Sequence, residues 1–151
     1  MIGKSEMAVQ LFKDGSNCSQ AILTVFGQLY GMEREFAQKL GRSLGGGLGR
    51  SGNTCGAITS AIAVLGLAQG NPADEAEARN TIARSVQEFI HCFEERHGTS
   101  LCRELLHADM STEEGQRKIK EEQLVNRLCP AFVKDAAEIL SELLSRESKV
   151  D

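Results

Sequence analysis

Five cysteines are the residues of this chain whose side chains could carry out chemistry: Cys18, Cys55, Cys92, Cys102 and Cys129. A cysteine thiolate attacks disulfides and binds metal ions, whereas a buried thiol packs as a small apolar side chain. The amino-terminal segment MIGKSEMAVQLFKDG lacks the apolar core of a signal peptide. We therefore expect a cytoplasmic protein whose cysteines are thiols, thiolates or metal ligands rather than structural disulfides.

Four of the five cysteines fall at expected helix starts. If a polar residue two positions earlier caps each helix, three of them take the second helical position: Cys18 after Ser16, Cys55 after Asn53 and Cys102 after Ser100. The fourth, Cys129, precedes Pro130 and is expected to cap the last helix. Unpaired N–H groups and a partial positive charge at a helix start stabilise a thiolate over a thiol. We expect the four sulfurs to converge on one pocket, with Cys55 as the most acidic thiol.

Cys92 differs from the other four because it lies in the middle of a helical pattern, within FIHCFEERHG. Its neighbours Phe89, Ile90 and Phe93 are apolar. Helical N–H groups in such a position are already bonded along the helix. We therefore interpret Cys92 as a packing residue.

The glycine-rich segment GGGLGRSG, residues 45–52, directly precedes Cys55. It contains the pattern GxGxxG of dinucleotide-binding loops, but no strand is expected before it. We interpret the glycines as backbone that turns with positive φ and passes close to the start of the Cys55 helix. Arg50 would add a positive charge near the thiolates, and Gly47, Gly49 and Arg50 are the residues that would contact a bound cofactor.

The three histidines, His91, His97 and His107, are near Cys92 and Cys102 in the sequence. A histidine could complete a metal shell or act as a base, although His97 before Gly98 is also typical of a helix end. No CxxC pair occurs, which is unlike simple zinc modules. Cysteines distant in sequence can still form a site assembled by folding.

Apolar residues recur three and four positions apart, whereas the alternation typical of strands is rare. We predict an all-α, single-domain helical bundle over residues 1–151, with the apolar segment 54–67 as its buried central helix. The expected elements are a first helix ending at Asp14-Gly15, a second from Ser16-Asn17 to Gly31, a third over 33–40, the central helix, a long helix from Asn71-Pro72 to His97-Gly98, a short one from Thr99-Ser100, one from Ser111-Thr112, and a last one from Pro130.

The formal net charge of -4 and the absence of a basic run argue against a nucleic-acid surface. No segment approaches the roughly 18 apolar residues of a membrane span, so we expect no membrane insertion.

The cysteine pattern resembles a family of redox-active proteins named for its motif C-GCAxxG-C-C. Cys18 in NCSQA matches its first cysteine, Cys55-Gly56-Ala57-Ile58-Thr59 its central element, and Cys102 in CRELL and Cys129 its third and fourth, over about residues 17–140. Ser60 replaces the second glycine of the element and would prevent the closest helix approach. The resemblance implies a redox role and, because such proteins are often encoded near transporters, a redox partner or a transporter as partner.

Three functions remain open at this point. In the first, which we favour narrowly, one cysteine thiolate attacks a disulfide and another resolves it, so that the chain is a thiol oxidoreductase. In the second, Cys18, Cys55, Cys102 and Cys129 bind a metal ion or an iron–sulfur cluster. In the third, the chain is a helical binding module associated with a transporter, and its cysteines only pack. The sequence leaves the oligomeric state open.

Overall fold

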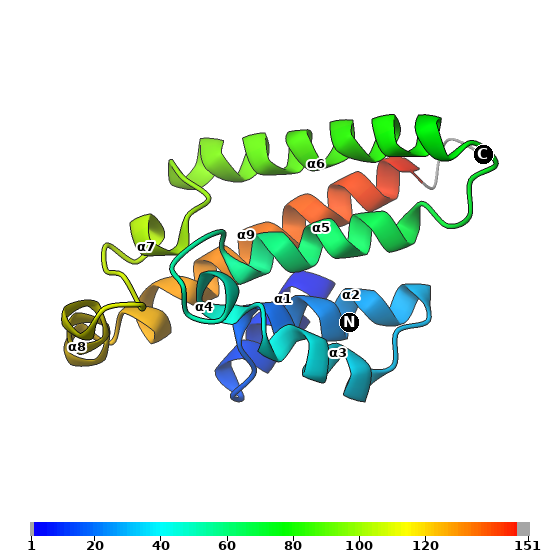
Figure 1. Cartoon of the computed structure of the whole chain (residues 1–151). Coiled ribbons are helices and arrows are strands. Elements are labelled where there is room, and N and C mark those ends of the chain that lie inside the picture. The colour runs from blue at the N-terminus through cyan, green and yellow to red at the C-terminus, as the bar shows by residue number, and fades with distance from the viewer. Residues whose placement is uncertain (1, 148–151) are drawn as a thin grey trace.

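A computed structural model describes residues 2–147 (Figure 1). Its elements in chain order are α1 (Lys4–Lys13), α2 (Cys18–Gly27), the 3-10 helix η1 (Gln28–Tyr30), α3 (Arg34–Arg42), α4 (Gly45–Leu48), α5 (Gly56–Ala68), α6 (Glu75–His97), α7 (Cys102–Leu105), α8 (Glu113–Glu122) and α9 (Leu124–Glu147). Within this range no β-strand forms, and an isolated antiparallel bridge joins Thr54 to Leu101. The predicted all-α fold is confirmed.

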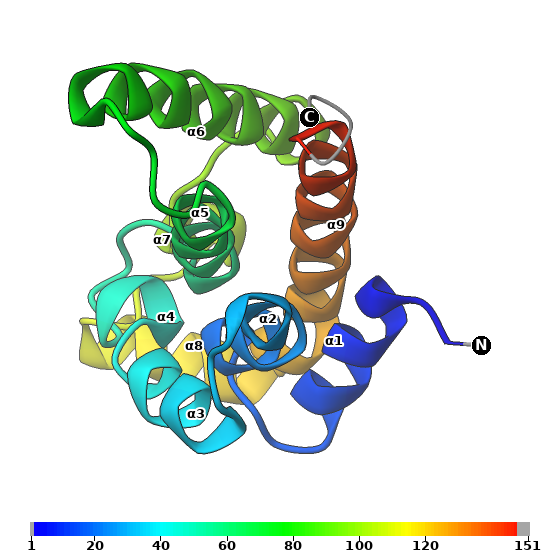
Figure 2. The same ribbon diagram turned by 90° about the vertical axis from the view of Figure 1, so that its right-hand side faces the viewer.

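Helix α5 is the buried central helix that its apolar sequence predicts. Figure 2 shows α2, α6 and α9 arranged around it, and all three contact it. The buried residues of α5 include Ile58, Val64 and Leu65, which pack in one core with Phe26 of α2 and Phe89 of α6. Burying each such side chain stabilises the fold by about 1.5–3 kcal/mol. The core therefore holds the start of α5, and with it Cys55, in a fixed place.

The first turn of α2 is fixed by a reciprocal pair of hydrogen bonds. The Asn17 side chain accepts from the Gln20 N–H at 2.8 Å, and the Gln20 side chain accepts from the Asn17 N–H at 2.9 Å. Asn17 is therefore the capping residue rather than Ser16, and Cys18 is the first residue of the helix rather than the second. An asparagine is at least as good a cap as a serine, which explains the shift by one residue.

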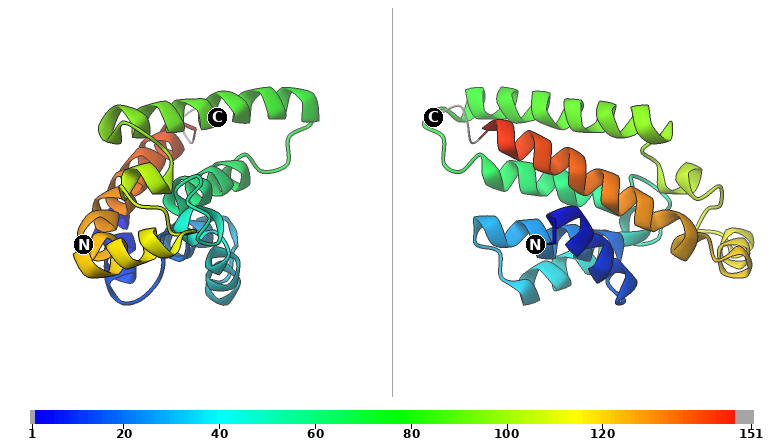
Figure 3. Two further views of the ribbon diagram at one scale, coloured as in Figure 1. Left: turned by 60° about the vertical axis from the view of Figure 1, so that its left-hand side comes forward. Right: turned by 180° about the vertical axis from the view of Figure 1, so that it is seen from behind.

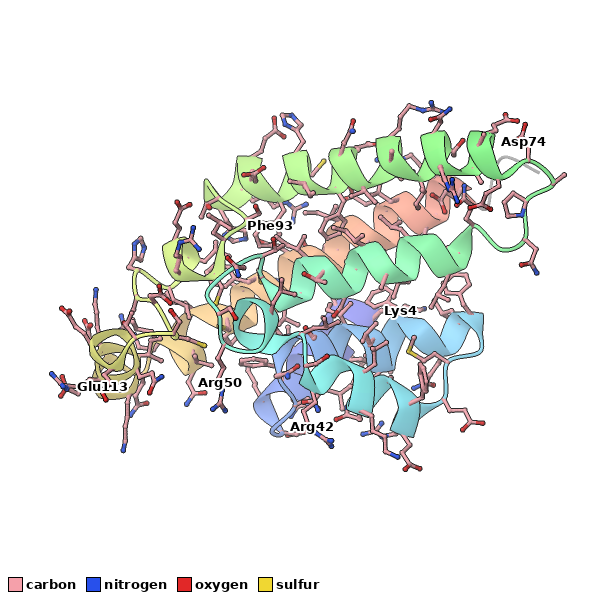
Figure 4. All side chains as sticks on the ribbon, in the orientation of Figure 1. Lys4, Arg42, Arg50, Asp74, Phe93 and Glu113 are labelled. Atoms are coloured by element: carbon pink, nitrogen blue, oxygen red, sulfur yellow. The ribbon has the colours of Figure 1, made fainter. Side chains whose placement is uncertain are left out.

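The start of α6 corrects a second prediction. Asp74 caps this helix, because its carboxylate accepts from the Ala76 and Glu77 N–H groups at 3.0 and 3.2 Å. Asn71 and Pro72 lie in the connection before it, and Figure 4 shows Asp74 at this end of α6. Aspartate is favoured at this position because its negative charge interacts with the partial positive charge at the start of a helix. The predicted end of this helix is confirmed, since Gly98, with a φ of 82°, directly follows the last helical residue, His97.

The last helix begins at Leu124, six residues before the position that Pro130 indicated. Proline is favoured at a helix start but normally disrupts a helix interior, because it lacks the N–H group. Here the apolar face of the helix continues across the proline, with Leu124, Leu128 and Phe132 packed in or against the core. Burial of this face outweighs the lost hydrogen bond. Cys129 consequently lies inside α9 and does not cap it.

Helix α8 lies at one end of the bundle, next to the start of α9, in both views of Figure 3. It is capped by Thr112, whose hydroxyl accepts from the Gly115 N–H at 2.9 Å, in the Ser111–Glu114 segment predicted as a helix start. None of the helices formed by residues 2–147 combines the length and the apolar character needed to cross a membrane.

Candidate functional site

Four cysteines from four different elements line one cavity of about 800 Å³: Cys18 at the start of α2, Cys55 before α5, Cys102 at the start of α7 and Cys129 in α9. The predicted convergence of the four residues on one pocket is confirmed, although Cys129 reaches it from inside α9 and not from a helix start. Cys55 and Cys102 are buried, whereas Cys18 and Cys129 are half-buried. All four are free thiols in the structure.

Cys18 is the acidic thiol of this group, with a pKa lowered to about 7. The main cause is a hydrogen bond that the Cys55 thiol donates to the Cys18 sulfur, and burial of the sulfur partly opposes it. The backbone N–H groups of Gly46 and Ser19 add two further donors. A thiolate surrounded by donors is stabilised over the thiol, so the surroundings of Cys18 favour its ionisation.

The Ser19 hydroxyl lies beside both the Cys18 sulfur and the Gly56 carbonyl. It donates to that carbonyl at 2.9 Å, and its single proton cannot serve both acceptors at once. Ser19 therefore mainly ties the start of α2 to the start of α5. This tie holds Cys18 and Cys55 next to each other.

Cys55 has a pKa well above the usual value, which reverses the expectation that it is the most acidic thiol. The first cause is the same hydrogen bond to Cys18, because Cys55 must keep its proton to donate it; burial and the negative charge of Cys18 act in the same direction. The expectation failed because it considered the helix start alone and not the neighbouring thiol. Cys55 is the capping residue of α5 and not its second residue.

Cys102 is placed by the backbone bridge that precedes it. The Cys55 N–H donates to the Ser100 carbonyl at 2.9 Å, and the Cys102 N–H donates to the Asn53 carbonyl at 2.7 Å. These bonds align the segment before α5 with the segment before α7. Burial raises the pKa of Cys102 to about 11, with smaller contributions from the charges of Cys18 and Asp109. Burial and the charges of Cys18 and Cys102 likewise raise the pKa of Cys129.

The glycine-rich segment forms a left-handed turn. Five successive residues, Gly46 to Arg50, have φ angles between 59° and 70°. Glycine adopts this conformation without steric penalty, and three of the five residues are glycines. The turn brings the Gly46 N–H to the Cys18 sulfur, which explains why the glycines precede a cysteine helix.

Close contacts show that the turn also requires small residues. A Cβ atom on Gly47 would lie 2.6 Å from the backbone of Asn53 and 2.7 Å from the Cys102 Cβ. A Cβ atom on Gly56 would lie 2.7 Å from the Cys18 sulfur. Of the residues proposed to contact a cofactor, Gly49 and Arg50 line the cavity, and Gly47 packs behind Cys102 instead.

Several cavity residues were not anticipated from the sequence: Lys13, Arg42, Met110 and Phe132. Arg42 lies just before the glycine-rich segment 45–52 and Arg50 lies within it, so their positions in the sequence could have identified both as cavity residues. Lys13 and Phe132 carried no comparable signal, because each belongs to the ordinary pattern of an amphipathic helix.

The other chemically active side chains lie outside the cavity. Cys92 packs against the core from α6, as predicted. His91 contacts Glu95 at 3.2 Å, and His97 contacts Asp135 of α9 at 2.6 Å between Phe93 and Phe132. His107 has a φ of 55° in the turn after α7. None of these side chains joins the cysteines.

The cysteines as arranged do not form a metal-binding group. Among residues 2–147 no three His, Cys, Asp or Glu side chains lie close enough together to hold one ion. The four cysteines line one cavity, but a tetrahedral metal site would need all four sulfurs at about 2.3 Å from one centre.

Ser60, which stands at the position of the second glycine, is fully buried in α5. Its hydroxyl oxygen has no hydrogen-bond partner among the described residues. A buried unpaired hydroxyl destabilises a fold by about 1–3 kcal/mol, so serine is an unfavourable residue at this position.

Comparison with known proteins identifies the family of the chain. Residues 16–143 match the family model described as "Putative redox-active protein (C_GCAxxG_C_C)". Searches of curated proteins and of solved structures give no match. The matched range contains every residue described above as lining the cavity except Lys13.

Proposed function

The chain belongs to the C_GCAxxG_C_C family, and from this premise we propose that it is a thiol–disulfide oxidoreductase in which Cys18 attacks and Cys55 resolves. The observation that carries the proposal is the placement of the two thiols: both line one cavity, and the Ser19 hydroxyl joins the starts of their helices through a hydrogen bond of 2.9 Å to the Gly56 carbonyl. The lowered pKa of Cys18 and the raised pKa of Cys55 support this choice of attacking and resolving thiol.

The two pKa shifts put the steps in order. The Cys18 thiolate attacks a disulfide R–S–S–R, forms the mixed disulfide Cys18–S–S–R and releases R–S⁻. The negative charge of Cys18 and its bond to the Cys55 proton are then gone, and both had raised the pKa of Cys55. Cys55 therefore becomes easier to ionise only after Cys18 has reacted. It loses its proton, attacks the Cys18 sulfur, releases the second R–S⁻ and leaves a Cys18–Cys55 disulfide.

Cys102 and Cys129 remain protonated near neutral pH, because burial raises the pKa of both. We assign them a supporting role as reduced, neutral thiols that line the same cavity. A reducing compartment such as the cytoplasm and a redox partner that restores the dithiol belong to this proposal. The link to a transporter stays a prediction.

A trapping experiment tests the assignment. The reduced Cys55→Ser variant should accumulate a mixed disulfide on Cys18 when treated with a small disulfide, and the wild-type chain should instead form the Cys18–Cys55 bond. Peptide mass spectrometry identifies both products, and Cys92→Ser serves as the control that behaves like wild type. A mixed disulfide formed first on Cys102 or Cys129 would contradict the proposal.

A metal or iron–sulfur centre is the second candidate, favoured by the convergence of four cysteines on one cavity. Such a centre would need the side chains to move closer together than they are. Anaerobic purification with an absorption spectrum and iron and zinc analysis decides between the candidates. Stoichiometric metal that is lost in the Cys102→Ser variant would favour the second.

A further inference from the structure

The charged side chains that line the cysteine cavity, apart from the cysteines, are basic. The lining contains Lys13, Arg42 and Arg50 and no aspartate or glutamate of residues 2–147, although the charge of Asp109 outside the lining acts on Cys102. The whole chain nevertheless carries a formal net charge of -4. A local excess of three positive charges on an acidic protein is a specific feature of this surface. Clefts lined by charge of one sign concentrate ligands of the opposite sign.

These three positive charges are available to a ligand. Lys13, Arg42 and Arg50 are exposed, and none forms an ion pair with any residue of the described part of the chain. Basic residues elsewhere, such as Lys39, Arg79 and Arg146, pair with a nearby glutamate. Figure 4 shows Arg42 and Arg50 extending from the same lower edge of the molecule in this view.

Arg50 is held in an unfavourable backbone conformation. Its φ is 65°, in the left-handed turn where glycine would fit without strain. A Cβ atom on Gly46 would lie 3.0 Å from the Arg50 Cγ, so the stem of the arginine packs over the residue whose N–H contacts the Cys18 sulfur. Leu48 of the same turn shares this conformation, so what distinguishes Arg50 is the position of its charged side chain over Gly46. Here the guanidinium would attract a negatively charged reactant to Cys18.

We propose that this cavity accepts a small organic disulfide bearing carboxylate groups, which Lys13, Arg42 and Arg50 attract and which Cys18 reduces. The inference rests on the proposed function and names its substrate class. The volume of about 800 Å³ is within the range of small-molecule sites, roughly 300–1,000 Å³. A dicarboxylate disulfide matches the excess positive charge, and Cys18 lines the same cavity as the three cations that would attract the carboxylates.

The reaction balances as a single turnover of the reduced protein. Cys18–S⁻, Cys55–SH and R–S–S–R give the Cys18–Cys55 disulfide, two R–S⁻ and one proton. The two cysteines lose two electrons and the substrate gains them. No further oxidant or reductant takes part.

The test compares three small disulfides of different charge with the reduced chain: dithiodipropionate (anionic), the disulfide of mercaptoethanol (neutral) and cystamine (cationic). The rate of Cys18–Cys55 disulfide formation should be highest for the anionic probe, and this preference should shrink as salt is added. The Arg42→Gln and Arg50→Gln variants should each lose about three- to tenfold of the rate with the anionic probe only. Arg34→Gln is the matched control, because Arg34 is exposed, has no ion pair in the described structure and lies outside the cavity.

A second measurement separates this inference from the proposed function. Alkylation of Cys18 by iodoacetate, which is anionic, and by iodoacetamide, which is neutral, requires no disulfide chemistry, and the ratio of the two rates compared between variants reports on local charge. We expect the iodoacetate-to-iodoacetamide ratio to fall in Arg42→Gln and Arg50→Gln but not in Arg34→Gln. Equal effects of all three substitutions, or equal rates with the three disulfides, would overturn the anionic substrate class. Failure of every disulfide to oxidise the chain, with the alkylation ratio as expected, would overturn the redox function and the disulfide as substrate, and would leave the preference of the cavity for anions.

Discussion

The Cys55 thiol donates a hydrogen bond to the Cys18 sulfur, and this contact sets the two pKa values in opposite directions. The residues come from different elements: Cys18 begins α2, and Cys55 caps α5. The Ser19 hydroxyl and the Gly56 carbonyl join those elements at 2.9 Å. This contact favours the thiolate of Cys18 and the neutral thiol of Cys55.

The ionisation of Cys18 should depend on Cys55. Alkylation of Cys18 followed against pH should give a midpoint of about 7, and Cys55→Ala should move that midpoint upward because the strongest donor is lost. Peptide mass spectrometry after a short pulse of iodoacetamide measures the rate at each cysteine. A lower midpoint at Cys55 than at Cys18 would restore the original expectation from the sequence.

Stability should rise with pH between about 7 and 9 through Cys18. Its pKa is lowered from 9.0 in the absence of the fold to about 7 in it, so the folded chain loses this proton before the unfolded chain does. This contribution to stability is complete above the pKa of Cys18 in the unfolded chain, and it is lost as the pH falls through the pKa of Cys18 in the folded chain. Below pH 7 the melting temperatures of the wild type and Cys18→Ser should differ by a constant amount.

Between pH 7 and 9 the melting temperature of the wild type should rise relative to that of Cys18→Ser. Cys92→Ser is the control, and its melting temperature should show the same pH dependence as that of the wild type. Above pH 9 the raised pKa values of Cys55, Cys102 and Cys129 act in the opposite sense, because the unfolded chain then ionises thiols that the fold keeps neutral. A difference that stays flat from pH 7 to 9 would show that Cys18 is not ionised by the fold.

Gly56 should not tolerate a side chain. In Gly56→Ala the new Cβ would lie 2.3 Å from the Ser19 Oγ, 2.7 Å from the Cys18 sulfur and 2.8 Å from the Leu44 carbonyl. We expect a loss of about 1–3 kcal/mol in the free energy of unfolding and a higher Cys18 midpoint, because the cysteines are pushed apart.

Gly66→Ala is the matched control in the same helix. Nothing lies within 4 Å of its added Cβ, so helix propensity alone should stabilise the chain by about 0.5–1 kcal/mol. Denaturant unfolding of both variants measures the two changes. Equal effects at the two positions would mean that the start of α5 is not tightly packed.

The helical bundle could be predicted because apolar spacing depends on local sequence, and the central helix over Ile58 to Leu65 is apolar on all sides. Helix starts were less predictable, since several good caps stood within a few residues, as Ser16 and Asn17 show. The position of Cys129 was wrong for a different reason: Pro130 is a strong local signal, but burial of Leu124 and Phe132 on one face overrides it.

The convergence of the four cysteines could be anticipated, whereas the assignment of the acidic thiol could not. The pKa of Cys18 depends on a second thiol and on the Gly46 N–H, both distant from it in the sequence. The glycine run signalled positive φ angles and a close approach. It gave no indication that Arg50 would share the left-handed conformation or that Lys13 would reach the same cavity.

Replacement of two cysteines should separate packing from chemistry. Cys92 lies in α6 against the core and outside the cavity, so Cys92→Ala removes packing contacts and should destabilise the chain by about 1 kcal/mol. It should leave the rate of disulfide exchange unchanged. Cys55→Ala removes the proposed resolving thiol and the donor to Cys18, so it should abolish formation of the intramolecular disulfide while Cys18 still forms mixed disulfides more slowly. Melting temperature and single-turnover exchange, measured on both variants, give the four values needed. Loss of exchange in Cys92→Ala with retention in Cys55→Ala would show that the reactive pair lies elsewhere in the chain.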